Sequence, residues 1–257
     1  MKDHRQYSMW LHCLPGKLAP RPALPGPLDV DVAIVGIGLT GLWTAYYLKK
    51  ADPGLRVAVL EREVAGFGGS GRNGGWCSSF FATSKATLAR EHGRPTTLAL
   101  QQIMYGTVDE VDRVVREEAI DAGLHKGGML EVATTPAQLE RVRAQVDDER
   151  SWGAGEDDVA FLGGEETGRR ITVRRCLGAF YTPHCASLDP ARLTRGLAEV
   201  VERLGAAIFE LTPVTAITLH CVHTRQGLVH AEVVVRATEA FTSGLPGHEH
   251  DYVPISR

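Results

Sequence analysis

The sequence has few cysteines and no clusters of basic residues, and both shortages argue against whole classes of function. Its 257 residues contain five cysteines, and none of them forms a CxxC pair. An odd number of cysteines in a chain of this length argues against a disulfide framework, so we expect reduced thiols in a cytoplasmic protein. The formal net charge is −3 and no basic run of useful length occurs, so nucleic acid is not an expected partner.

The sequence also shows neither a leader pattern nor a clear membrane span. Residues 1–10 are polar and mixed in charge, without the apolar core and cleavage site of a signal peptide. Residues 32–48 contain no charged side chain, which approaches the length of a short membrane span. Three glycines and a strand-like beginning argue against a membrane helix there, so no membrane partner is expected.

The first third of the chain reads as an arm followed by a βαβ unit. Residues 11–27 carry five of the 13 prolines, which predicts a proline-rich N-terminal arm over residues 1–28. Residues 32–35 and 56–60 are short β-branched or apolar runs typical of buried strands, and residues 40–50 between them read as a helix. The crossover of such a unit is right-handed.

Helices and strands continue to the end of the chain. Apolar spacing predicts a helix over 94–122, and Thr135 with Gln138 forms a capping box that begins another. Asp189 and Pro190 begin a third helix that ends at Gly205. Further strands are predicted at 129–132, 207–210, 214–220 and 228–237, and residues 233–235 resemble a strand buried on both faces.

The first predicted strand leads directly into a glycine motif. Residues 36–41 match G-x-G-x-x-G between a strand and a helix, as a dinucleotide-binding turn requires. Gly36 permits the tight turn, Gly38 lets the backbone approach a pyrophosphate, and Gly41 lets the helix pack on the strand. Glu61 ends the second strand, where a carboxylate accepts hydrogen bonds from an adenosine ribose and repels a 2′-phosphate. This arrangement favours FAD or NAD over NADP.

A second glycine-rich segment favours FAD over NAD. Residues 66–75 contain six glycines together with Ser70, so the backbone can pass closely over a large ligand such as a flavin nucleotide. The alternative is a flexible surface loop. Three aromatic residues that follow at once, Trp76, Phe80 and Phe81, indicate a packed segment instead.

These motifs resemble a known family. Residues 29–87 resemble the beginning of flavoenzymes of the D-amino-acid-oxidase type, and residues 70–75 are similar to the branch that contains γ-glutamylputrescine oxidase. The resemblance resumes over residues 186–205 and ends with residues 235–240. It implies an α/β fold: a Rossmann-like FAD-binding domain and an incomplete α+β substrate domain, the first over 29–90 and 186–245 and the second over 91–185 and 246–257.

The resemblance also implies which residues contact the cofactor. Some relatives attach the flavin to a histidine at a position where this chain has Arg72, so non-covalent FAD is expected. Val214 corresponds to a valine that meets the adenine, and Ala237 and Thr238 correspond to residues near the pyrophosphate. The full set of expected cofactor-binding residues is Gly36, Gly38, Leu39, Thr40, Gly41, Glu61, Arg62, Gly69, Ser70, Arg72, Asn73, Gly74, Gly75, Val214, Ala237 and Thr238.

By resemblance, such an enzyme oxidises a C–N bond of an amine or amino acid by hydride transfer to the flavin. We expect a C-terminally truncated form with impaired activity, which a second polypeptide could complete. The alternatives are a nucleotide-binding fragment without turnover, one half of a split oxidase, or, less favoured, an NAD-dependent dehydrogenase. No catalytic residue is identified. The short pairs Cys221/His223 and His248/His250 lack a second pair at zinc spacing, so no metal site is expected.

Overall fold

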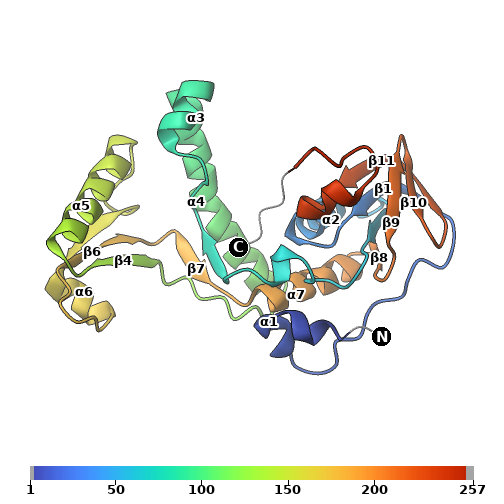
Figure 1. Ribbon diagram of the computed structural model, residues 1–257, viewed down its shortest axis with the longest axis horizontal. Helices are drawn as coiled ribbons and strands as arrows, with labels where there is room; N and C mark the ends of the chain where they lie inside the picture. Colours follow the sequence, from blue (N-terminus) through green and yellow to red (C-terminus); the bar gives the residue numbers. More distant parts are fainter. Residues whose placement is uncertain (1–2, 253–257) are drawn as a thin grey trace. The chain divides into compact units, whose positions relative to one another are not determined.

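The computed structural model describes residues 3–252, so the last part of the expected segment 246–257 lies outside the described residues. The chain forms two compact units. The first contains the residues up to Gly75, the short segment Ile120–Ala122 and the chain from Asp189 onward. The second contains Trp76–Ala119 and Gly123–Leu188. Each unit has its own sheet (Figure 1).

The first unit is built on a six-stranded mixed sheet. Its strands lie in the order β8 (Ala207–Phe209), β2 (Val57–Leu60), β1 (Leu28–Val35), β11 (Leu228–Arg236), β10 (Cys221–Thr224) and β9 (Val214–Thr218). Strand β1 pairs in parallel with β2 and β11, β2 pairs in parallel with β8, and β9 and β10 are antiparallel additions. The predicted α/β class and the central position of the first strand are confirmed.

Two helices pack on this sheet because each carries an apolar face. Helix α2 (Leu39–Ala51) packs on β1 and β2, and α7 (Pro190–Arg203) packs on α2 and β8. The α7 side chains Leu193, Leu197, Val200 and Val201 are buried. Asp189 caps α7, as predicted, by accepting hydrogen bonds from the N–H groups of Ala191 and Arg192.

Two predicted strands in the first unit are present, but the end of one and the burial of the other differ from the prediction. The strand predicted over 214–220 ends at Thr218, because the chain turns through His220 at φ +57° and returns as β10. Residues 233–235 are not buried on both faces, since Val233 is 53% exposed. The apolar core on this sheet includes Val229 and Ala231 but does not extend to Val233, so a valine run alone did not determine burial.

The second unit consists of a three-stranded antiparallel sheet, a strand pair and four helices. The sheet runs β4 (Met129–Ala133), β6 (Gly178–Thr182), β5 (Ala160–Gly163), and β3 (Trp76–Ser78) pairs with β7 (Cys185–Ser187). The helices are α3 (Lys85–His92), α4 (Arg94–Glu117), α5 (Pro136–Ser151) and α6 (Gly164–Arg170). The capping box of Thr135 and Gln138 is present at α5, and Val142 and Val146 pack against Phe180.

The units divide the chain at slightly different places from the expected domains. Residues 76–90 belong to the second unit, because β3 pairs with β7 and α3 packs on α4. The described residues after 245 belong to the first unit. The assignment of one unit to the cofactor and the other to the substrate stays a prediction.

The N-terminal arm is packed on the first unit and is partly helical. A 3-10 helix (His4–Tyr7) and the short helix α1 (Met9–His12) precede its extended part. Leu11 and Leu14 are buried against Ala191 of α7. Helix α1 therefore lies beside α7 (Figure 1), because its apolar residues gain from burial there.

A buried carboxylate joins the extended part of the arm to two other segments. Glu210 follows β8 and is fully buried. Its Oε1 accepts hydrogen bonds from the N–H of Ala65 at 2.7 Å and from Nη1 of Arg21 at 3.2 Å, and its Oε2 accepts one from the N–H of Arg21 at 2.7 Å. Arg21 also pairs with Glu202 at 2.8 Å. A buried charge needs such partners, so this one fixes how the three segments meet.

We expect Glu210→Ala to lower the free energy of unfolding by about 3–5 kcal/mol, because it leaves a largely buried guanidinium with one partner and two N–H groups without acceptors. The matched control is Glu202→Ala, which removes the half-exposed partner of the same arginine and should cost at most about 1 kcal/mol. Urea unfolding of the three proteins measures both values. Equal losses in the two variants would contradict this account.

Candidate functional site

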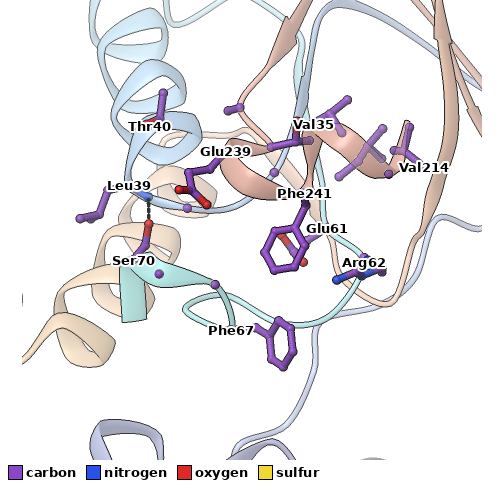
Figure 2. Close-up of a pocket in the computed structure, with 18 of the residues that line it drawn as sticks. Val35, Leu39, Thr40, Glu61, Arg62, Phe67, Ser70, Val214, Glu239 and Phe241 are labelled. Carbon is purple, nitrogen blue, oxygen red and sulfur yellow. Dashed lines mark hydrogen bonds between the residues drawn. The ribbon is translucent and has the colours of Figure 1, made fainter. Parts of the chain in front are cut away.

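A pocket opens in the first unit at the edge where β1, β2 and β11 end. Its volume is about 420 Å³, within the usual range for a small-ligand site. Val35 and Leu60, the last residues of β1 and β2, form part of its floor. The ligand side of an open parallel sheet is the edge at the carboxyl ends of its strands. Figure 2 shows the side chains that surround this space.

The first glycine motif turns tightly at the rim of the pocket. Gly36 has φ +106°, and a Cβ added to it would lie 2.3 Å from the carbonyl oxygen of Ala237. A Cβ on Gly41 would lie 2.1 Å from the carbonyl oxygen of Gly36. Neither position tolerates a side chain, because real Cβ atoms do not approach that closely. The turn therefore places the beginning of α2, which carries the positive end of the helix dipole, against the pocket.

Glu61 lies in the pocket directly after β2. Its Oε2 accepts a hydrogen bond from the N–H of Ile37 at 3.1 Å, and its Oε1 accepts one from the N–H of Glu63 at 2.9 Å. Burial raises the pKa of the Glu61 carboxyl, and these two backbone N–H groups oppose the rise. A carboxylate has about four acceptor positions, so Glu61 can accept further hydrogen bonds from a ligand.

The second glycine-rich segment forms another wall of the pocket. A Cβ on Gly71 would lie 2.1 Å from the carbonyl oxygen of Gly66, so this segment folds tightly on itself. Ser70 Oγ accepts a hydrogen bond from the N–H of Leu39 at 2.9 Å and thereby joins this wall to the first turn of α2 (Figure 2). Thr194 of α7 donates to the carbonyl oxygen of Ser70 at 3.2 Å.

A third segment closes the pocket from the end of β11. The Ala237 N–H donates to the carbonyl oxygen of Val35 at 2.8 Å, which continues the sheet past β11. A 3-10 helix (Glu239–Gly244) follows. Its Phe241 ring lies 4.8 Å from the guanidinium carbon of Arg62. Arg62 and Phe241 thus meet at the rim (Figure 2).

Most of the sequence-predicted site residues line this one pocket. The structure brings together Gly36, Gly38, Leu39, Thr40, Glu61, Arg62, Gly69, Ser70, Asn73, Val214, Ala237 and Thr238. Four predicted residues do not line it. Gly41 packs against Gly36 instead, and Arg72 lies over the Phe67 ring at 5.1 Å. Gly74 and Gly75 follow the wall without lining the pocket. Whether the twelve lining residues bind a cofactor stays a prediction.

The structure adds eight lining residues that the sequence analysis did not select: Val35, Leu60, Phe67, Gly68, Glu239, Phe241, Gly244 and Leu245. Phe67 and Gly68 belong to the glycine-rich segment already identified, so its full length could have been chosen. Val35 and Leu60 end the two predicted strands. Glu239 belongs to the last segment of the resemblance, residues 235–240, and could have been chosen with Ala237 and Thr238. The residues from Phe241 onward had no local signal, because only the fold returns them to the pocket.

The discounted polar pairs have local partners. His223 Nε2 lies 3.0 Å from Thr218 Oγ1, and His248 Nδ1 lies 2.8 Å from Asp251 Oδ2. Within residues 3–252, no group of three or more His, Cys, Asp or Glu side chains is placed to hold a metal ion. None of the helices described there combines the length and apolar character needed to cross a membrane.

Comparison with known proteins finds relatives that are named as an oxidoreductase and an oxidase. The chain is 29% identical over 228 residues to "Gamma-glutamylputrescine oxidoreductase" of Escherichia coli (strain K12), covering 88% of this chain and 52% of the relative. It is 30% identical over 224 residues to "Glycine oxidase" of Geobacillus kaustophilus (strain HTA426), covering 84% and 56%. The chain therefore spans about half the length of the curated relatives it matches.

Solved structures and a family model agree with these relatives. The crystal structure of glycine oxidase from Geobacillus kaustophilus matches with a TM-score of 0.66 and 26% identity, over 86% of this chain and 58% of that one. The L-amino acid deaminase from Proteus myxofaciens matches in fold with a TM-score of 0.69 at 22% identity, over 88% and 48%. The family model "FAD dependent oxidoreductase" (DAO) matches residues 31–256. The chain belongs to the DAO family of FAD-dependent oxidoreductases.

Proposed function

We propose that the first unit binds FAD non-covalently in the pocket described above, and that the protein oxidises a C–N bond of an amine or amino acid. FAD is the cofactor of the family. The observation that carries the proposal is the convergence of three segments on one pocket. The three that carry the proposal are the glycine turn at Gly36, the residue Glu61 after β2 and the second glycine-rich segment. Each has a separate use in holding a dinucleotide.

The pocket fits the pyrophosphate and adenosine parts of such a cofactor. A Cβ on Gly38 would lie 2.9 Å from Ser70 Oγ, so a side chain there would crowd the serine that joins the second wall to the first turn of α2. Glu61 keeps acceptor positions free for ribose hydroxyl groups. Val214 at the start of β9 would face the adenine, and Ala237 and Thr238 would lie beside the pyrophosphate.

The lining residues also support a non-covalent mode of binding. Among the described residues that line the pocket, none is a histidine or a cysteine. Arg72, which stands where some relatives have a flavin-linked histidine, lies over Phe67 instead of lining the pocket. The arginine at this position, in place of a histidine, is what supports non-covalent binding.

The substrate class comes from the relatives and is part of the proposal. The names of the two relatives refer to γ-glutamylputrescine, an amine, and to glycine, an amino acid. When bound, FAD supplies the acceptor for a hydride from the carbon next to nitrogen. The residues of this chain bind and orient the cofactor, and we assign none of them a proton-transfer role.

A finer proposal concerns the 257 residues assayed by themselves. Since the curated relatives are about twice as long as the matched region, we expect these residues to bind FAD more readily than they turn over an amine. A second polypeptide could supply the remainder. The competing hypothesis is a nucleotide-binding protein without turnover.

The visible spectrum of the purified protein tests the proposed function. We expect a flavin band after incubation with FAD and gel filtration, and release of intact FAD on acid precipitation because no covalent bond forms. Bleaching by an amine or amino acid without oxygen would support oxidation of the C–N bond. A protein that stays colourless with FAD but binds NAD would contradict the proposal. A flavin band that no substrate bleaches would favour the competing hypothesis.

Glu61 should dominate recognition of the adenosine. We expect Glu61→Ala to raise the Kd for FAD by about 10- to 100-fold, the effect of losing hydrogen bonds to a charged acceptor. Fluorescence quenching of FAD measures the affinity. The control is Glu232→Ala, an exposed carboxylate on β11 away from the pocket, which should leave the Kd unchanged. Equal values in both variants would refute the role of Glu61.

The affinity should also depend on pH through the same group. Because burial raises the pKa of Glu61, its carboxylate becomes protonated at a higher pH than an ordinary glutamate. Protonation turns one acceptor oxygen into a donor. FAD binding should therefore weaken as the pH falls through the raised pKa. The Glu61→Ala variant should lack this dependence, and a similar pH profile in both proteins would count against the assignment.

Glu239 is the lining residue least suited to a pyrophosphate. It is exposed and lines the pocket together with Leu39 and Thr40 of α2, and Figure 2 shows its carboxylate toward that turn. We expect Glu239→Gln to strengthen FAD binding by about two- to tenfold at low salt, because a like charge is removed, and less at high salt. Titrations at two ionic strengths measure this, with Glu232→Gln as the control. Weaker binding by Glu239→Gln would contradict it.

A further inference from the structure

Residues 4–11, which we call the N-terminal strap, contact the pocket wall at three separate points. The wall segment is residues 63–73, which includes most of the second glycine-rich segment. The strap itself is anchored by Leu11, which is fully buried and packs with Leu14 against Ala191 of α7. That anchor is ordinary core packing, whereas His4, Tyr7 and Trp10 contact the wall.

The first contact lies next to the pocket acid. His4 is 4% exposed, and its Nε2 lies 3.0 Å from Oε2 of Glu63. The backbone N–H of Glu63 in turn donates to Glu61 Oε1 at 2.9 Å. His4 therefore holds the chain at the residue whose backbone orients the Glu61 carboxylate.

The second contact involves the aromatic residue in the middle of the wall. Phe67 lines the pocket, and the rings of His4 and Tyr7 meet it edge to face, with centroids 5.8 Å and 5.4 Å away. Such edge-to-face contacts fix ring orientation as well as position. The strap thus contacts Phe67 through two rings that do not line the pocket.

The third contact fixes the far end of the wall. Trp10 Nε1 donates to the carbonyl oxygen of Asn73 at 2.8 Å. Asn73 Nδ2 donates to the carbonyl oxygens of Gly69 and Ser70 at 3.2 Å and 3.1 Å. Ser70 is the residue whose hydroxyl meets the first turn of α2.

The wall needs outside support because of its composition. Residues 66–71 include four glycines, and glycine loses more conformational freedom on ordering than any other residue. The wall is also held by helix α7, which packs on residues 69–71, and by hydrogen bonds such as that from the Ala65 N–H to Glu210. The strap is placed to reduce the number of conformations that the wall samples before a ligand arrives.

We propose that His4, Tyr7 and Trp10 are positioning residues for the FAD pocket: they hold wall residues 63–73 in the shape that binds the cofactor, although none of them lines the pocket. The inference rests on the proposed function for the identity of the ligand. Its structural part, that the strap orders the wall, does not depend on which nucleotide binds.

The test compares Trp10→Phe with Met9→Ala in the full chain. Trp10→Phe removes the hydrogen bond to Asn73 and keeps an aromatic ring, whereas Met9 lies on the same helix and is 66% exposed. Hydrogen exchange is measured without ligand at the N–H groups of Phe67, Gly71 and Arg72, which donate to wall carbonyls at 3.0, 3.2 and 3.2 Å. Trp10→Phe should speed their exchange by about two- to tenfold, the effect of one net hydrogen bond.

Exchange in β1 serves as the reference for global stability. It should be unchanged in Trp10→Phe, and FAD affinity should fall by about the same two- to tenfold factor. A double variant, His4→Ala with Tyr7→Ala, should speed wall exchange and weaken FAD binding more than Trp10→Phe does. If the double variant does not fold, the single variant decides. Unchanged wall exchange in Trp10→Phe, or equal acceleration in the wall and β1, would overturn the proposal.

The two proposals can fail separately. If the wild-type protein binds no FAD while wall exchange still responds to Trp10→Phe, the proposed cofactor is wrong and the positioning role stands. If FAD binds and the variant changes neither wall exchange nor affinity, the cofactor assignment stands and the strap is only a packed arm.

Discussion

The pocket depends on the parallel register of β1 between β2 and β11. Val35 is the register partner of both Leu60 and Arg236, so all three strands end at the same level of the sheet. The next residues along the chain, Gly36 and Glu61, therefore emerge side by side. Two backbone hydrogen bonds continue the ladder past the strand ends, including one from the Gly36 N–H to the Leu60 carbonyl oxygen at 2.8 Å. A shift of register by one residue would turn each strand over and separate these groups.

The pocket also requires close approach of one backbone segment to another, which glycine makes possible. The turn at Gly36 and the fold of Gly71 over Gly66 each bring main chains closer than any side chain allows. The high glycine content leaves room for a ligand. It also leaves the second glycine-rich segment with little conformational preference of its own. Contacts from outside compensate for it, from the buried carboxylate of Glu210, from helix α7 and from the N-terminal strap.

Much of this site was predictable because its signals are local. Gly36, Gly38 and Glu61 follow from a motif whose spacing is set by one βαβ unit, and that spacing is preserved in any chain that forms the unit. The predictions weakened where residues depend on distant packing. Val233 was expected to be buried, since valine runs are typical of parallel strands, but no core extends over it. Arg72 was expected at the ligand, yet it lies over Phe67.

The sequence by itself determined the βαβ unit, the helix capped by Asp189 and the glycine turn, because each is defined by interactions within a few residues or by strand and helix periodicity. Only the tertiary structure decided which distant segments share the pocket. Phe241 reaches it because β11 pairs beside β1, and the N-terminal arm reaches the wall because Leu11 is buried on α7. Such contacts depend on how separate elements pack, and neither residue type nor spacing along the chain encodes that packing locally.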